Sequence, residues 1–173
     1  MKNVTRFAAI AAGAGLLAAC GGGGEEAREK QIEDMAKRHG VNADVELDDK
    51  GEVASVKINN GMGGATVGSN LSLPDNFPSD VSVDDNWSVM AISPAPGVDG
   101  FMVNAMTDDS VEETLSKLRS SLGAKGWTEE ASDQPTPQMQ RINFVKDDRM
   151  TNVNLISGGP QLTVQLVTMK KPG

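Results

Sequence analysis

Residues Ser110–Trp127 read SVEETLSKLRSSLGAKGW, and this stretch predicts an amphipathic helix whose two ends are both specified. Ser110 and Glu113 have the spacing of a capping box, in which each side chain accepts a hydrogen bond from a backbone N–H group of the first turn. Gly126 is suited to the left-handed conformation that ends many helices. Four apolar residues recur at helical spacing and share one face: Val111, Leu115, Leu118 and Leu122.

Strand patterns on both sides of this helix supply a surface for its apolar stripe. In the segment 161–169, Leu162 and Val164 alternate with Thr163 and Gln165, which predicts a sheet with one covered face and one wet face. The expected strands span 87–93, 100–107, 127–131, 139–146, 149–156 and 161–169. This order predicts an α+β domain over residues 87–173, a two-layer fold with an antiparallel sheet and one amphipathic helix packed on it.

The segment 25–60 predicts a small N-terminal unit made of a helix and a β-hairpin. Acidic residues open the helix Glu25–His39, and Lys37 and Arg38 close it. Its apolar stripe is narrow, so it is either a solvated stalk or a partner-binding helix. Strands over 44–47 and 52–58 follow, joined by a turn of sequence DDKG.

The segment 61–86 predicts a loop followed by a strap that contains proline. The Gly- and Asn-rich part has neither the lysine nor the following helix of a phosphate-binding loop. In LPDNFPSDV, residues 73–81, Pro74 and Pro78 favour an extended strap outside any strand ladder. Asp75, Asp80 and Asp84 lack the dense spacing of a calcium loop.

The first 24 residues have the pattern of a secretory signal and a tether. Residues 1–19 contain a basic start with Lys2 and Arg6, then an apolar run that is shorter than the roughly 20 residues of a membrane span. Removing them takes two basic and no acidic residues, which changes the net charge from −8 to −10. Cys20, the only cysteine, is followed by four glycines, so residues 20–24 predict a flexible tether.

The residues Leu17-Ala-Ala-Cys20 resemble a bacterial lipobox. This resemblance implies cleavage before Cys20, lipidation of its thiol and acylation of the new amino group, so that palmitate and related chains anchor the protein to a membrane. Gly21, rather than Asp, implies an outer-membrane location facing the periplasm. An ordinary secreted protein with an incidental cysteine is the alternative.

A second resemblance covers the region from about Gln31 to the C-terminus. On LPDNFPSDV, on SVEETLSKLRSSLGAKGW and on the strands that follow, the chain is similar to small, uncharacterised bacterial lipoproteins. More loosely, its helix and antiparallel sheet resemble domains of outer-membrane assembly accessory lipoproteins. Neither resemblance implies a set of catalytic residues.

The remaining residue types favour binding over catalysis. His39 is the only histidine, and no G-x-S-x-G elbow exists. With Cys20 lipidated, no free thiol remains, so we expect neither a metal site nor a cofactor. The acidic pairs at 48–49, 84–85, 108–109 and 147–148 fall at element boundaries, where Asp favours turns. The negative charge disfavours nucleic acid as a partner.

The sequence therefore predicts a lipid-anchored envelope lipoprotein that is not an enzyme and binds a protein or another envelope component. The wet sheet face and the loop 61–70 are the expected contact surfaces. A small-ligand carrier, or a hydrolase whose site is assembled from Asp and Ser residues, is the alternative hypothesis.

Overall fold

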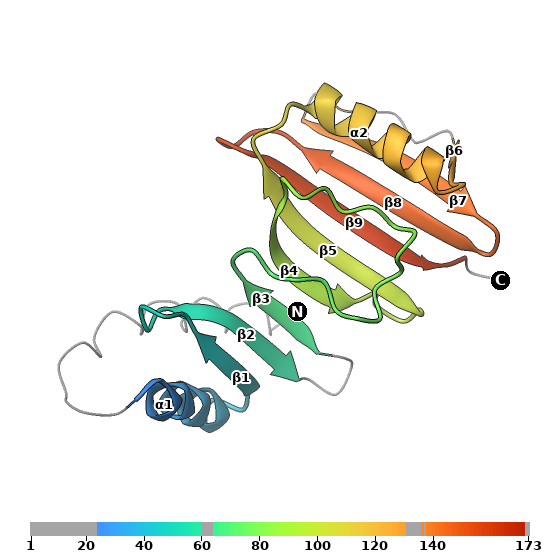
Figure 1. Ribbon diagram of the computed structural model, residues 1–173. Coiled ribbons are helices and arrows are strands. Elements are labelled where there is room, and N and C mark those ends of the chain that lie inside the picture. Colours follow the sequence, from blue (N-terminus) through green and yellow to red (C-terminus); the bar gives the residue numbers. More distant parts are fainter. Residues whose placement is uncertain (1–23, 60–63, 131–135, 137, 172–173) are drawn as a thin grey trace.

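The computed structural model of the chain describes residues 24–59, 64–130, 136 and 138–171 (Figure 1). The predicted signal, Cys20 and residues 21–23 of the tether lie outside these residues, as does part of the loop expected at 61–70. The described strands form one open antiparallel sheet in the order β1-β2-β3-β4-β5-β9-β8-β7-β6.

The elements follow the chain in a simple order. The two helices are α1 (Glu25–Arg38) and α2 (Val111–Ala124). The first five strands are β1 (Asn42–Leu47), β2 (Val53–Asn59), β3 (Ala65–Gly68), β4 (Ser88–Pro94) and β5 (Gly100–Thr107). The last four strands are β6 (Thr128–Glu130), β7 (Met139–Lys146), β8 (Arg149–Ile156) and β9 (Leu162–Lys170).

The prediction for α2 is confirmed at both ends. The backbone N–H of Glu113 donates to the Ser110 hydroxyl at 3.2 Å, and the Ser110 N–H donates to the Glu113 carboxylate at 2.9 Å. Leu118 and Leu122 are buried, while Val111 and Leu115 are only partly buried. Gly126 has a φ of 84°, a conformation that favours glycine.

The core lies on one face of strands β4, β5, β9, β8 and β7. Figure 1 shows α2 and the segment between β3 and β4 lying across these strands. That segment, residues 69–87, contains the predicted strap, and we call it the strap. Phe77 of the strap packs on Phe101 of β5 with ring centroids 5.4 Å apart, and Val81 is buried in the core. The strap therefore closes the apolar layer that α2 leaves open.

The predicted N-terminal helix and β-hairpin are present as α1 and β1-β2, but the hairpin is part of the main sheet. The hairpin β1-β2 continues into the same sheet through β3, a strand that lies inside the segment predicted to be a loop. β3 pairs with β2 over four residues and with β4 over two, Thr66 with Ile92 and Val67 with Ala91. Thr66 and Val67 favour a strand, but the run is only four residues long and lies between glycines, so pairing on both sides determines its conformation.

Helix α1 lies beside the edge strand β1. The outward N–H groups of Val45 and Leu47 donate to the carboxylates of Glu33 and Glu29, at 3.1 and 3.0 Å. These side chains occupy N–H groups that an exposed sheet edge would otherwise offer to another chain. The buried side chains of Ala36 and Val45 add a small apolar contact. At the other edge of the sheet, β6 is short and exposed.

Candidate functional site

The face of strands β5, β9, β8 and β7 that points away from the core forms the broadest candidate surface. In the middle of each strand, every second side chain is buried, and the alternate ones point to the opposite side. We call these alternate residues the open face. They are Met102, Asn104, Met106, Met139, Arg141, Asn143, Val145, Met150, Asn152, Asn154, Ile156, Thr163, Gln165, Val167 and Met169.

A ladder of polar side chains crosses the open face. The Arg141 Nε donates to the Asn154 Oδ1 at 2.8 Å, and the Asn154 Nδ2 donates to the Gln165 Oε1 at 3.1 Å. The Gln165 Nε2 then donates to the Asn104 Oδ1 at 3.3 Å. These residues stand directly opposite one another in the register of four adjacent strands. These three hydrogen bonds join neighbouring side chains and restrict their orientations.

Beside this ladder lies an exposed apolar row. Met139 stands opposite Ile156, Ile156 opposite Thr163, and Thr163 opposite Met106. The side chains of Met139, Ile156 and Met106 are 37%, 40% and 38% exposed. Three of the large exposed apolar side chains of the described chain are therefore aligned in one row across four strands.

The open face also differs from the rest of the protein in charge and composition. The chain has 24 acidic and 16 basic residues, yet the open face has no acidic residue and one basic residue, Arg141. It carries five of the nine methionines: Met102, Met106, Met139, Met150 and Met169. Methionine is flexible and polarizable, and it is common on surfaces that adapt to a partner.

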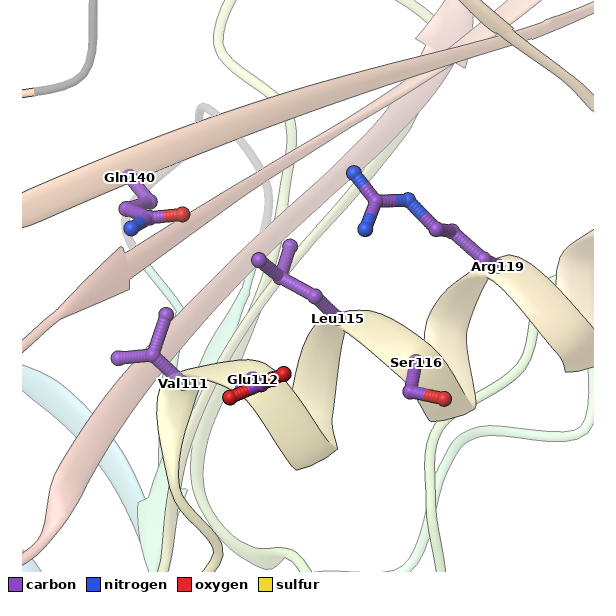
Figure 2. Close-up of a pocket in the computed structure, with 6 residues that line it drawn as sticks. All are labelled: Val111, Glu112, Leu115, Ser116, Arg119 and Gln140. Atoms are coloured by element: carbon purple, nitrogen blue, oxygen red, sulfur yellow. The ribbon is translucent and has the colours of Figure 1, made fainter.

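A second candidate is a groove of about 590 Å³ between α2 and β7. Figure 2 shows Val111 and Leu115 projecting from α2 toward the strand that carries Gln140. The groove is also lined by Glu112, Ser116 and Arg119.

The ionic groups at this groove are already paired or isolated. The Arg119 guanidinium donates two hydrogen bonds to the Glu129 carboxylate, at 2.9 and 3.0 Å. These bonds raise the pKa of Arg119 and lower that of Glu129. Ser116 lacks an imidazole partner, because His39 lies at the end of α1, beside the opposite edge of the sheet. The groove therefore offers an apolar floor without a nucleophile–base pair.

A smaller cavity of about 370 Å³ lies between the strap and α2. At its rim the Lys117 ammonium donates to Asp109 at 2.6 Å and lies 3.7 Å from Asp84. The hydrogen bond to Asp109 is the main cause of a raised pKa of Lys117. Trp87 lines the cavity, and its buried Nε1 has no hydrogen-bond partner within the described chain.

Asp80 of the strap is the most heavily paired carboxylate in the described chain. It accepts hydrogen bonds from both terminal nitrogens of Arg149, one of them at 2.9 Å, and from the Lys146 Nζ at 2.7 Å. The hydrogen bond from Arg149 is the largest cause that holds the pKa of Asp80 far below its usual range. The Arg149 guanidinium also lies 5.1 Å from the ring centroid of Trp127. Sequence reasoning missed this cluster, which joins the strap to the β7–β8 hairpin.

The structure places the acidic residues weighed in the sequence at turns and ion pairs. The Asp48 carboxylate accepts from the N–H groups of Lys50 and Glu52, and Asp84 accepts from the N–H of Asn86. Asp75 is exposed, so the strap aspartates do not converge. Within the described residues, no cluster of His, Cys, Asp and Glu is placed to hold a metal ion.

The membrane-related predictions concern residues that the structure does not describe. Cys20 and the signal lie outside them, and Gly24, the last tether residue, is exposed. Neither α1 nor α2, the helices of the described chain, combines the length and the apolar character that a membrane-spanning helix requires.

Comparison with known proteins gave no match to a protein-family model, to a curated protein or to a solved structure.

Proposed function

We propose that this protein is a lipid-anchored lipoprotein of the cell envelope, without enzymatic activity, that binds a protein partner through its open face. In this proposal Cys20 carries the lipid, and the tether places the body beside the outer membrane on its periplasmic side. The body acts as a two-layer α+β unit in which α2 and the strap provide stability and the open face provides contact.

The composition of the open face is the observation that carries the binding proposal. Protein interfaces have cores that are depleted of charge and enriched in large apolar side chains, methionine among them. The open face combines a partly apolar patch that carries no carboxylate with a ladder of hydrogen-bonded polar side chains. The buried Oδ1 of Asn143, on the same face, has no hydrogen-bond partner within the described chain. If this acidic protein made no contact with a partner, a patch without carboxylates would not improve its solubility.

Metabolic labelling with radioactive palmitate tests the anchor. We expect the wild-type protein to incorporate label and to fractionate with membranes, and Cys20→Ser to do neither. Label in both proteins, or in neither, would contradict the proposed anchor.

Photo-cross-linking in cells tests the binding surface. A photoreactive amino acid at Thr163, at the centre of the apolar row, is compared with one at Ser120, an exposed position on α2. We expect a discrete adduct from position 163 that is absent from position 120. Equal, diffuse adducts from both positions would mean that the open face binds no specific protein.

A further inference from the structure

We propose that the protein bound by the open face is a second copy of this chain, packed face to face on the same membrane. The inference rests on the proposed function, because it takes the open face to be the binding surface. It adds the identity of the partner.

Charge is the first argument for a second copy. Two identical molecules with a net charge of −8, or −10 without the signal, repel one another over most of their surfaces. The open face has no carboxylate and one guanidinium, so two copies approach there without an acidic pair across the contact. Bringing like charges together in an interface costs several kcal/mol. Two identical acidic proteins can therefore bind each other only through a surface without facing carboxylates.

In the register of the sheet, Val45, Val56, Val67 and Ala91 lie on the same side as Asn104 of the open face, and Asp44 and Lys57 lie on the core side. These positions of the N-terminal strands therefore add no carboxylate to the side of the sheet that carries the open face.

Size is the second argument. Four adjacent strands about 4.8 Å apart, with about eight residues each at about 3.4 Å per residue, give a face of about 500 Å². Two such faces bury about 1,000 Å², which reaches the area that a specific protein interface needs. This area is larger when the uneven surface of the side chains and the adjoining strand β4 are included. Sheets packed in this way lie about 10 Å apart with nearly aligned strands.

The side chains of the open face suit contact with a copy of itself. An interface with two-fold symmetry uses the same patch twice, so the patch must be complementary to itself. Unbranched methionines can enter gaps between the side chains of the facing sheet. Anchoring both copies to one membrane also raises their effective concentration.

The test uses the full-length, lipid-modified protein in cells that express two copies with different affinity tags. The photoreactive residue is again placed at position 163 or, as the control, at position 120. We expect an adduct of twice the monomer mass from position 163 that contains both tags. An adduct that joins one copy to a different protein would overturn the second-copy proposal and leave the proposed function intact. No discrete adduct would overturn both.

A charge substitution provides a second, independent measurement. Ile156 on the open face and Val98 in the β4–β5 turn are 40% and 39% exposed, so Ile156→Asp and Val98→Asp form a matched pair. We expect Ile156→Asp to reduce the two-tag adduct at least about tenfold, because it places a carboxylate on each facing sheet, and Val98→Asp to leave it unchanged. Equal adduct from both variants would overturn the proposal.

Reversing the charge separates loss of contact from loss of folding. When Ile156→Asp and Ile156→Arg are expressed in one cell, opposite charges face each other across the contact. We expect the mixed adduct to exceed both same-charge adducts, a result that a folding defect cannot produce. If the mixed adduct does not exceed them, the face-to-face packing is wrong.

Discussion

The cluster in which Asp80 binds Lys146 and Arg149, which we call the clamp, leads to the strongest prediction about stability. Asp80→Asn keeps the shape of the side chain but removes the charge that two cations share, the Arg149 guanidinium and the Lys146 ammonium. Breaking a fully buried pair costs about 3–5 kcal/mol, whereas an exposed pair contributes about 0–1 kcal/mol. The side chains of Asp80, Lys146 and Arg149 are 24%, 26% and 27% exposed, so the site lies between these limits. We expect a loss of about 2–3 kcal/mol in the free energy of unfolding.

The same site predicts a dependence on pH. The pKa of Asp80 is lowered in the folded protein, so on acidification the unfolded chain takes up the proton first. The stabilisation from Asp80 is therefore present above the unfolded pKa of about 3.9 and is lost as pH falls from about 5 toward the lower, folded pKa. We expect the wild-type protein to lose more unfolding free energy over this range than Asp80→Asn, which has no carboxylate to titrate there.

Urea denaturation followed by tryptophan fluorescence measures both effects. The chain has two tryptophans, Trp87 and Trp127, and both are buried, so unfolding changes their emission. Glu129→Gln is the control, because its partner Arg119 is 52% exposed and we expect a loss below about 1 kcal/mol. If Asp80→Asn lies within about 0.5 kcal/mol of wild type, or shows the same acid dependence, the assigned role of the clamp is wrong.

Three further predictions concern the core, the sheet edge and the open face. Leu118→Ala, at a buried position of α2, should cost about 2–5 kcal/mol of unfolding free energy, and a loss near zero would contradict the packing of this helix on the sheet. Replacing Glu29 and Glu33 together by Ala should accelerate amide hydrogen exchange at Val45 and Leu47 while the core strands remain protected; unchanged exchange would mean that these carboxylates do not hold the edge. Mild peroxide treatment should reduce the proposed two-tag adduct, since methionine sulfoxide is polar, and should leave the emission of the buried tryptophans unchanged; an adduct that survives oxidation of these methionines would contradict their role in the contact.

The sequence predicted the elements whose signals are local. The capping box of α2 lies within four residues, and the alternation in β9 lies within nine, so both could be read without knowledge of the fold. The N-terminal part of the sheet could not be predicted in this way. β3 is four residues long and follows a glycine-rich segment, and it is a strand because β2 and β4 pair with it.

The candidate surfaces depend on register, which single-sequence patterns do not supply. Gln165 was predicted on the wet face, but its neighbours Asn104 and Asn154 are 61 and 11 residues away. Asp80 was weighed as a cation ligand, yet its partners Lys146 and Arg149 are 66 and 69 residues away, and they make it part of a clamp. Patterns within a strand therefore indicated which side a residue faces, and only the pairing of strands indicated which residues meet.

The two sides of strands β5, β9, β8 and β7 are subject to different physical requirements. On the covered side, packing against α2 and the strap restricts volume and excludes charge, as the fully buried Val103, Val153 and Val164 illustrate. On the open side, sheet formation requires only side chains that suit a strand, and charged pairs across neighbouring strands would meet that requirement while improving solubility. Methionines and a ladder made mostly of neutral amide side chains improve solubility less than charged pairs do. Contact with another protein surface accounts for this choice, because burial favours apolar flexibility and paired polar groups and disfavours carboxylates.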